Sequence, residues 1–217
     1  MRHAGGMTLR VVLGGGGSAL DEERVLARFA TTVGTNARVL YVPWARADTT
    51  RPELGDWASS VLSEHAIRRV DVASAIEPQP LTAYDGVFLG GGNTYLLLRR
   101  LRSTGMHGEL ARAIRDGLPC YGGSAGAIVL GAHIGTCAHL DSNDIGLTDL
   151  AGLDLLGGRS VWVHYRADDR KRMQAFAAET GCALLVVAEN AGFAFDGTTA
   201  EGIGPGHHEL WAAPPVA

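Results

Sequence analysis

Short apolar runs alternate with longer amphipathic stretches along the chain. Valine, leucine and phenylalanine dominate the apolar runs, such as "LRVVLG" and "GVFLGG", and such runs are typical of buried strands. In the first amphipathic stretch, acidic Asp21, Glu22 and Glu23 occupy the first turn, where the helix dipole favours negative charge. The pattern predicts strands at 9–14, 37–43, 68–73, 86–91, 119–123, 160–164, 184–189 and 192–197. It predicts helices at 20–33, 53–65, 93–102, 106–116, 125–133 and 168–180.

The alternation of strands with helices predicts the fold class. Several of the strands are almost entirely apolar, which indicates a mostly parallel sheet covered by helices on both faces. We therefore expect an α/β fold, with a single three-layer domain over residues 1–217. Met7 is a second candidate first residue, so residues 1–7 are expected to be a disordered or added start.

Glycine and polar residues follow most of the predicted strands. In parallel sheets, ligands bind at the carboxyl ends of the strands. We therefore expect the functional residues to share one edge of the predicted sheet. The segments that end at this edge are 14–18, 43–46, 90–93 and 122–124, together with His164 and Glu189.

The stretch "YGGSAGA" places Ser124 between a predicted strand and a predicted helix. Gly122-x-Ser124-x-Gly126 matches the nucleophile elbow, in which a strained turn exposes a serine hydroxyl above the sheet. Small flanking residues are needed there, because a bulky side chain would clash with the neighbouring backbone. A turn whose serine only caps the following helix is the alternative.

A nucleophilic serine needs a base and an acid that orients the base. His164 ends the apolar run "SVWVH", and imidazole suits general-base catalysis because it titrates close to neutral pH. Four aspartates lie between Ser124 and His164. Asp144, beside Asn143, is preferred as the acid, although spacing alone does not choose it over Asp141.

The second glycine run, "FLGGGNTYLLL", ends a buried strand and opens a helix. Backbone N–H groups of Gly91 or Gly92 are candidates for one donor of an oxyanion hole, with Ala125 supplying the other. Close packing of a strand-to-helix turn explains the glycines equally well.

Composition and charge exclude several classes. The 217 residues include 19 basic and 23 acidic side chains, giving a net charge of −4 without a basic block, so no nucleic-acid partner is expected. Three cysteines lack zinc or C-x-x-C spacing, and neither a metal nor another cofactor is predicted. With no apolar run of signal-peptide or membrane-spanning length, we expect a cytoplasmic protein without membrane contact.

Other classes share parts of these motifs. An α/β-hydrolase esterase has the same elbow, but His164 follows Ser124 by only 40 residues and no H-G-G-G segment is present. Gly14-x-Gly16-x-x-Ala19 forms part of a dinucleotide fingerprint, without the acidic residue expected after the second strand. A non-catalytic ligand-binding member of the same fold is a further alternative, and the presence of serine, histidine and aspartate argues against it.

Several motifs together resemble one family. "FLGGGNTYLLLRRL", "YGGSAGA", "SNDIGLTDLAGLDLL" and "VHY" stand in the order and approximate spacing of the peptidase E family of serine peptidases, which is related to cyanophycinases. The resemblance covers roughly residues 86–200 and implies a class I glutamine amidotransferase-like fold.

The resemblance also implies roles for individual residues. Ser124 matches the nucleophile, His164 the base, and Asp144 the acid, while Glu189 is the second choice for the acid or a substrate contact. The oxyanion hole would come from the Gly-Gly-Gly-Asn segment, including Asn93, and from Ala125. A homodimer is an expectation that comes from the family alone.

One departure from the family concerns the substrate. The family's aspartyl dipeptidases carry a longer segment after the histidine, whereas "HYRADDRKRMQAF" passes almost directly into a helix here. Arg166, Arg170 or Arg172 is a candidate for holding a substrate carboxylate. We therefore expect a di- or tripeptidase acting from the N-terminal end, rather than a strict aspartyl dipeptidase.

Overall fold

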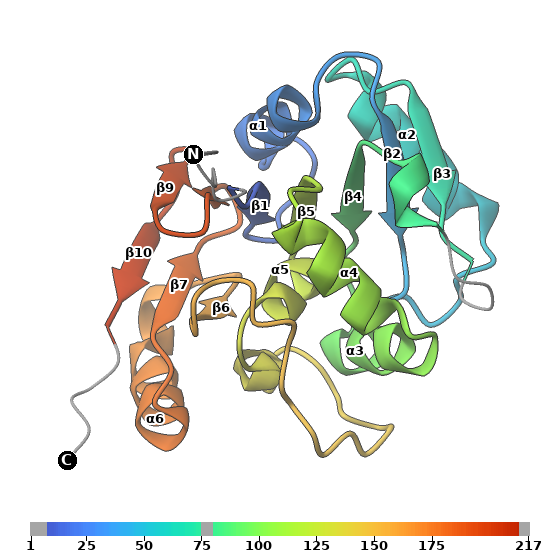
Figure 1. Ribbon diagram of the computed structural model, residues 1–217. Coiled ribbons are helices and arrows are strands. Elements are labelled where there is room, and N and C mark those ends of the chain that lie inside the picture. The colour runs from blue at the N-terminus through green and yellow to red at the C-terminus, as the bar shows by residue number, and fades with distance from the viewer. Residues whose placement is uncertain (1–7, 75–79, 213–217) are drawn as a thin grey trace, which may run out of the picture.

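A seven-stranded sheet forms the centre of the computed structural model, which describes residues 8–74 and 80–212 (Figure 1). The predicted start at residues 1–7 lies outside this range. The first five strands in the spatial order β3-β2-β4-β5-β1 are parallel, and β8 and β9 complete the sheet in antiparallel pairing. The strands are β1 (Val11–Gly14), β2 (Arg38–Val42), β3 (Arg69–Val72), β4 (Gly86–Leu89), β5 (Cys120–Gly123), β8 (Gly192–Phe195) and β9 (Ala200–Ile203).

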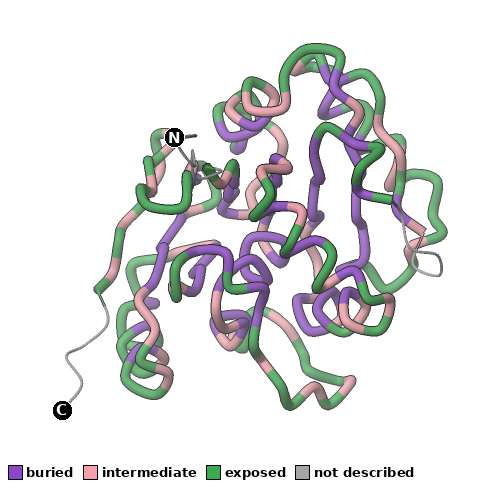
Figure 2. Tube along the Cα trace, viewed as in Figure 1, coloured by how far each residue is buried: buried purple, intermediate pink, exposed green. Residues whose placement is uncertain are grey.

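Helices cover both faces of this sheet. Along β1, Val11 and Leu13 face one hydrophobic cluster and Val12 faces another, as the alternation of a strand requires. The cluster around Val12 receives α1 (Glu23–Val33) and α2 (Pro52–Ser63), and the other receives α3 (Thr94–Ser103), α4 (Met106–Arg115) and α5 (Ala125–Leu130). Figure 2 shows the central strands as buried. The predicted three-layer α/β fold is confirmed.

A second, three-stranded sheet has the order β10-β7-β6 and consists of β6 (Ser160–Trp162), β7 (Leu184–Val187) and β10 (His208–Trp211). Its outer face packs on α6 (Arg170–Thr180) through Trp162 and Met173, and its inner face joins the main core. The predicted strands at 160–164 and 184–189 are therefore present, but they do not extend the central sheet. Apolar patterning specifies that a strand is buried and does not specify its neighbours.

The remaining predicted strands and helices are also present, with bounds that differ by a few residues and are mostly shorter. The two strands without a prediction are β9 and β10, whose sequences "AEGI" and "HELW" are polar and half exposed. Such edge strands lack the apolar signal that identified the others.

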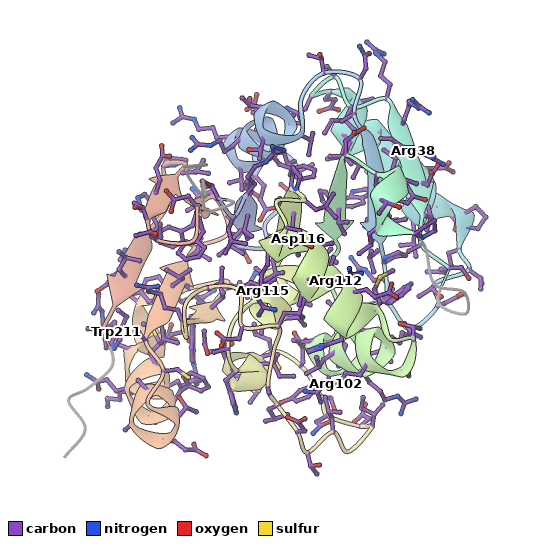
Figure 3. All side chains as sticks on the ribbon, in the orientation of Figure 1. Arg38, Arg102, Arg112, Arg115, Asp116 and Trp211 are labelled. Carbon is purple, nitrogen blue, oxygen red and sulfur yellow. The ribbon has the colours of Figure 1, made fainter. Side chains whose placement is uncertain are left out.

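A long connection over residues 131–159 joins α5 to β6, and much of it is exposed. Arg102 donates from Nη1 to the Asp149 carbonyl at 2.8 Å and from Nη2 to the Ala151 carbonyl at 2.7 Å. Arg115 donates to the Leu153 carbonyl at 3.2 Å. Both arginines are labelled in Figure 3. Two helices on the same face therefore hold a loop that has little secondary structure of its own.

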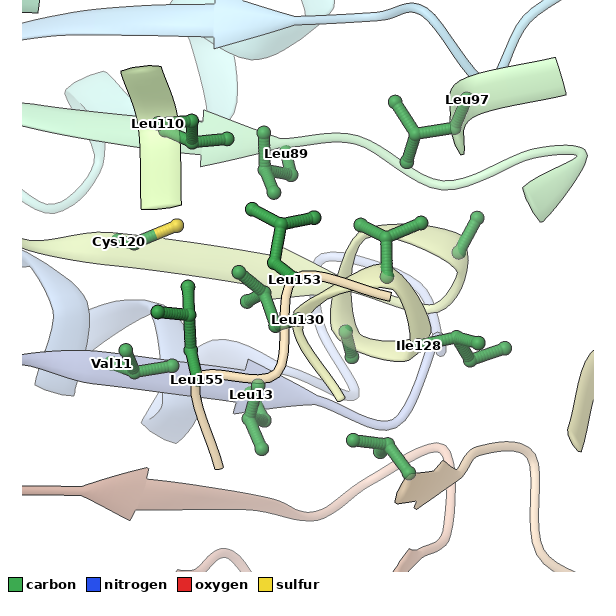
Figure 4. Packing of buried hydrophobic residues seen from close by; sticks show 14 of the residues in the cluster. Val11, Leu13, Leu89, Leu97, Leu110, Cys120, Ile128, Leu130, Leu153 and Leu155 are labelled. Carbon is green, nitrogen blue, oxygen red and sulfur yellow. The ribbon is translucent and has the colours of Figure 1, made fainter. Parts of the chain in front are cut away.

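The short helix α5 lies in the middle of the main core. Figure 4 shows Ile128 and Leu130 of α5 among side chains from the strands and from the long connection, including Leu89 and Leu153. The helix approaches β4 so closely that a Cβ at Gly126 would lie 2.2 Å from the Leu89 carbonyl oxygen. Gly126 is therefore required for packing rather than for backbone conformation.

Replacing Gly126 with alanine should destabilise the protein, although alanine is the better helix former. The clash with backbone should cost about 1–3 kcal/mol in the free energy of unfolding, measured by urea denaturation. Gly108→Ala in α4 is the matched control, because its added Cβ meets nothing within 4 Å. That variant should gain up to about 1 kcal/mol. Equal effects of the two substitutions would contradict this account of α5.

Candidate active site

Ser124 lies in a strained turn between β5 and α5. Its φ of 52° and ψ of −114° are unusual for a residue with a side chain. Its N–H donates to the Gly14 carbonyl at 3.3 Å, and its carbonyl accepts from the N–H groups of Ala127 and Ile128. A Cβ at Gly122 would lie 2.5 Å from the Gly126 carbonyl oxygen, so both flanking glycines are needed. This is the geometry of a nucleophile elbow.

His164 connects Ser124 to a carboxylate. Ser124 Oγ lies 2.9 Å from His164 Nε2, and His164 Nδ1 lies 2.9 Å from Glu189 Oε1. An ionised carboxylate only accepts hydrogen bonds, so the Nδ1–H donates to Glu189. Nε2 is then left as the acceptor for the Ser124 hydroxyl. The arrangement is that of a serine, its base and the group that orients the base.

The acid expected from the sequence, Asp144, is not at this position. It is exposed on the long connection, and its carboxylate accepts a hydrogen bond from the Ser142 hydroxyl. No hydrogen bond within the described residues joins it to His164. Asp141 is closer to the site, where it lines the cavity and accepts from the Thr94 N–H at 2.8 Å. The carboxylate that pairs with the imidazole is that of Glu189 after β7, the residue that the resemblance gave as the second choice for the acid.

The glycine run after β1 supports both members of the hydrogen-bonded pair. The Gly15 carbonyl accepts from the His164 N–H at 3.0 Å, just as the Gly14 carbonyl accepts from Ser124. Gly16 has a φ of 98°, and a Cβ there would lie 2.4 Å from His164 Nε2 and 2.9 Å from the Ser124 Cβ. The sequence had allowed a dinucleotide fingerprint at this run. In the structure the space beside it is filled by the serine and histidine.

Glu22 also contacts the glycine run after β1. Its side chain is 5% exposed and accepts hydrogen bonds from the Gly16 N–H at 2.7 Å and from the Tyr121 hydroxyl. Burial raises the pKa of the carboxyl to about 7, while hydrogen bonds from Tyr121 and from the Gly16 and Gly17 backbone lower it. Sequence reasoning missed this residue, because acidic residues in a first helical turn are common.

The three candidate oxyanion donors lie beside Ser124. A Cβ at Gly91 would lie 3.2 Å from the Ser124 Cβ, Gly92 lines the cavity, and Ala125 is the first residue of α5. Across the described ranges, no turn, loop or capping hydrogen bond uses the N–H of any of the three. Asn93 has a structural role, because its Oδ1 caps α3 at the Leu96 N–H and its Nδ2 donates to the Ser142 carbonyl.

A cavity of about 900 Å³ opens beside Ser124 and His164. Two arginines line it, and both are paired: Arg166 lies 3.8 Å from Asp168, and Arg172 lies 2.9 Å from Asp169. Arg170, a predicted substrate contact, is not among the lining residues. It pairs with Glu209 and lies over the Trp211 ring. Within the described residues, the cavity carboxylates that have no arginine partner are those of Asp21, Asp141 and Glu189.

Among the residues that the structure describes, no group of three or more histidine, cysteine, aspartate or glutamate side chains is arranged to hold a metal ion. In that same part of the chain, every helix is too short or too polar to cross a membrane.

Known proteins resemble this chain in both structure and sequence. A crystal structure from Listeria monocytogenes EGD-e, described as a candidate peptidase E, superposes with a TM-score of 0.71 at 18% identity, covering 91% of this chain and 99% of the other. A peptidase from an acI-B1 Actinobacterium gives a TM-score of 0.69 at 17% identity and covers 97% of this chain and 93% of the other. At these identities the likeness establishes the fold alone.

Sequence relatives are named Peptidase E. The protein from Streptomyces coelicolor is 32% identical over 131 residues, which cover 56% of this chain and 47% of that protein. The protein from Salmonella arizonae is 27% identical over 136 residues, covering 62% of this chain and 57% of its own length. The chain thus spans about half the length of the curated relatives it matches.

The family model for peptidase family S51 matches residues 11–203. The match includes the elbow, His164 and Glu189, and it extends over most of the described chain. It confirms the resemblance to peptidase E that the motifs indicated. The chain therefore belongs to peptidase family S51.

Proposed function

We propose that the protein is a serine peptidase that removes residues from the N-terminal end of short peptides. Ser124 acts as the nucleophile, His164 as the general base, and Glu189 as the acid that orients the imidazole. The observation that carries the proposal is the continuous line of hydrogen bonds from Ser124 through His164 to Glu189, both at 2.9 Å. Membership of a peptidase family supports the reaction class.

The reaction follows the chemistry of an acyl-enzyme. His164 Nε2 accepts the hydroxyl proton as Ser124 Oγ attacks the scissile carbonyl, and Glu189 stabilises the resulting imidazolium. The imidazolium returns the proton to the leaving amine when the C–N bond breaks, and water then hydrolyses the ester. N–H groups of Gly92 and Ala125 receive the developing oxyanion, and each such donor contributes roughly 3–4 kcal/mol in comparable sites.

The charges at the cavity support a broad specificity at the N-terminal residue. A substrate aspartate would need a free guanidinium, and the two arginines that line the cavity of about 900 Å³, Arg166 and Arg172, already face Asp168 and Asp169. The carboxylates of Asp21 and Asp141 instead suit the ammonium group of a free peptide N-terminus. We therefore favour di- and tripeptides with varied first residues.

Ser124→Ala should abolish peptide hydrolysis. We expect kcat/KM to fall by at least about a thousandfold on a panel of di- and tripeptides, because removal of the nucleophile prevents formation of the acyl-enzyme. Circular dichroism and the melting temperature serve as controls for folding. If the wild type cleaves neither peptides nor a simple ester, a ligand-binding role replaces this proposal. Hydrolysis of the ester alone would favour an esterase.

Glu189→Gln and Asp144→Asn form a matched pair that identifies the acid. The amide at position 189 favours the wrong imidazole tautomer and does not stabilise the imidazolium, so kcat should fall about 10²- to 10⁴-fold. Asp144→Asn should stay within about twofold of wild type, since its carboxylate contacts only Ser142 among the described hydrogen bonds. A larger loss in Asp144→Asn than in Glu189→Gln would restore the aspartate as the acid.

A peptide library with variable first residues tests the specificity. We expect release of several different N-terminal residues, with Asp-X peptides not preferred, and at least about tenfold slower cleavage of N-acetylated peptides, because acetylation removes the ammonium charge. Mass spectrometry of the digest provides the measurement. Release of N-terminal aspartate alone would contradict the proposed broad specificity while leaving the serine mechanism intact.

A further inference from the structure

One acidic side chain near the site has no part in the mechanism above. Glu22 stands at the N-terminal boundary of α1, yet its side chain caps no N–H of that helix. It turns instead to the glycine run, where it accepts from Gly16 at 2.7 Å. The Tyr121 hydroxyl, from β5, donates to its second oxygen. No ion pair joins Glu22 to a basic side chain in the described part of the chain.

A buried carboxylate without a basic partner is unfavourable for folding. Helix α1 gains no capping bond from it, and a neutral side chain would fill the same space in the core. The two carboxylate oxygens are used in hydrogen bonds instead, one with the glycine run and one with the strand that leads to Ser124. The position of Glu22 is thus better explained by the site than by the fold.

The glycine run transmits this contact directly to the reacting groups. Gly14 and Gly15 accept from the backbone N–H groups of Ser124 and His164, and Gly16 lies against the imidazole ring. Both Ser124 and His164 have a positive φ, so their conformations depend on the hydrogen bonds that hold them. A shift of Gly16 would change the distance between Ser124 Oγ and His164 Nε2.

We propose that ionised Glu22 is a positioning residue, which holds the glycine run through the Gly16 N–H and thereby keeps His164 in hydrogen-bonding distance of Ser124. The inference rests on the proposed serine chemistry. It adds a second carboxylate to the site, one that acts through the backbone and does not touch the substrate.

A second cavity, of about 170 Å³, gives this carboxylate a route to water. Glu22, Ser124 and His164 all line it, and so does the exposed Arg46. The other titratable groups facing Glu22 are its neighbour Asp21 and the Tyr121 hydroxyl, which raise and lower its pKa respectively. Glu22 can therefore exchange its proton without unfolding.

The pH dependence has a defined sign. Burial raises the pKa of Glu22 from 4.5 to about 7, so the carboxylate is ionised above this pH and protonated below it. A protonated carboxyl has one acceptor fewer for the Gly16 and Tyr121 donors. Activity should fall as the pH drops through about 7, because protonation of Glu22 weakens its hold on the glycine run. This protonation should add about one to the slope of log kcat against pH on the acid side.

The test compares Glu22→Gln with Glu23→Gln, an exposed neighbour that loses the same charge. We expect kcat of Glu22→Gln to fall at least about tenfold with KM within about threefold, and the acid slope to be lower than that of wild type by about one. Glu23→Gln should behave like wild type. The rate at which a fluorophosphonate modifies Ser124, followed by mass spectrometry, should fall in parallel.

Tyr121→Phe provides a second variant with a different signature. It removes a hydrogen bond that lowers the pKa of Glu22, so the acid limb should move to higher pH and kcat should recover above about pH 8.5. Glu22→Gln should not recover at any pH, because its amide cannot ionise.

The results separate this proposal from the proposed function. If Glu22→Gln keeps the wild-type kcat, acid slope and Ser124 reactivity and changes only in its melting temperature, the positioning role is overturned. If wild type cleaves no peptide, the proposed function fails. In that case the role of Glu22 is still decided by the rate at which the fluorophosphonate modifies Ser124, compared between Glu22→Gln and Glu23→Gln.

Discussion

The close approach of the glycine run after β1 to the turn after β5 is the constraint on which the site depends. Two successive carbonyls, of Gly14 and Gly15, accept from the backbones of Ser124 and His164 at 3.3 and 3.0 Å. Neither contact could form around a side chain at Gly16, since a Cβ there would overlap the imidazole. Strained conformations persist where the surroundings determine them from several sides, and one loop does so for both residues.

The site is assembled from two sheets. The central sheet supplies the turn with Ser124, whereas His164 and Glu189 follow β6 and β7 of the smaller sheet. The inner face of the smaller sheet joins the main core through Val161 and Leu185. The packing between the sheets therefore also sets the positions of His164 and Glu189 relative to Ser124. A change in that core would therefore reach the site without touching a polar residue.

Stability and the proposed chemistry oppose each other at Glu22. Burial favours the neutral acid and raises its pKa to about 7, while the positioning role uses the carboxylate. The strained φ values of Ser124 and His164 carry a similar cost. Costs of this kind are typical of functional sites, where stability is lost in exchange for a defined geometry.

The long connection between α5 and β6 is held differently, by arginines on α3 and α4, and its Asp144 stays at the surface.

The sequence by itself determined the elements, the α/β class and the elbow. Burial of apolar runs and the turn around Ser124 are local properties, so β1 to β8 and the six helices could be predicted. His164 could be predicted as the base because it ends an apolar run, at the kind of strand end where ligands bind. The tertiary structure decided the rest. It separated β6 and β7 into their own sheet, left Asp144 exposed, and brought Glu189 to His164 and Glu22 to Gly16. Those contacts join segments far apart in the chain, and which carboxylate reaches a given imidazole depends on how the sheets pack, a property that residue spacing does not encode.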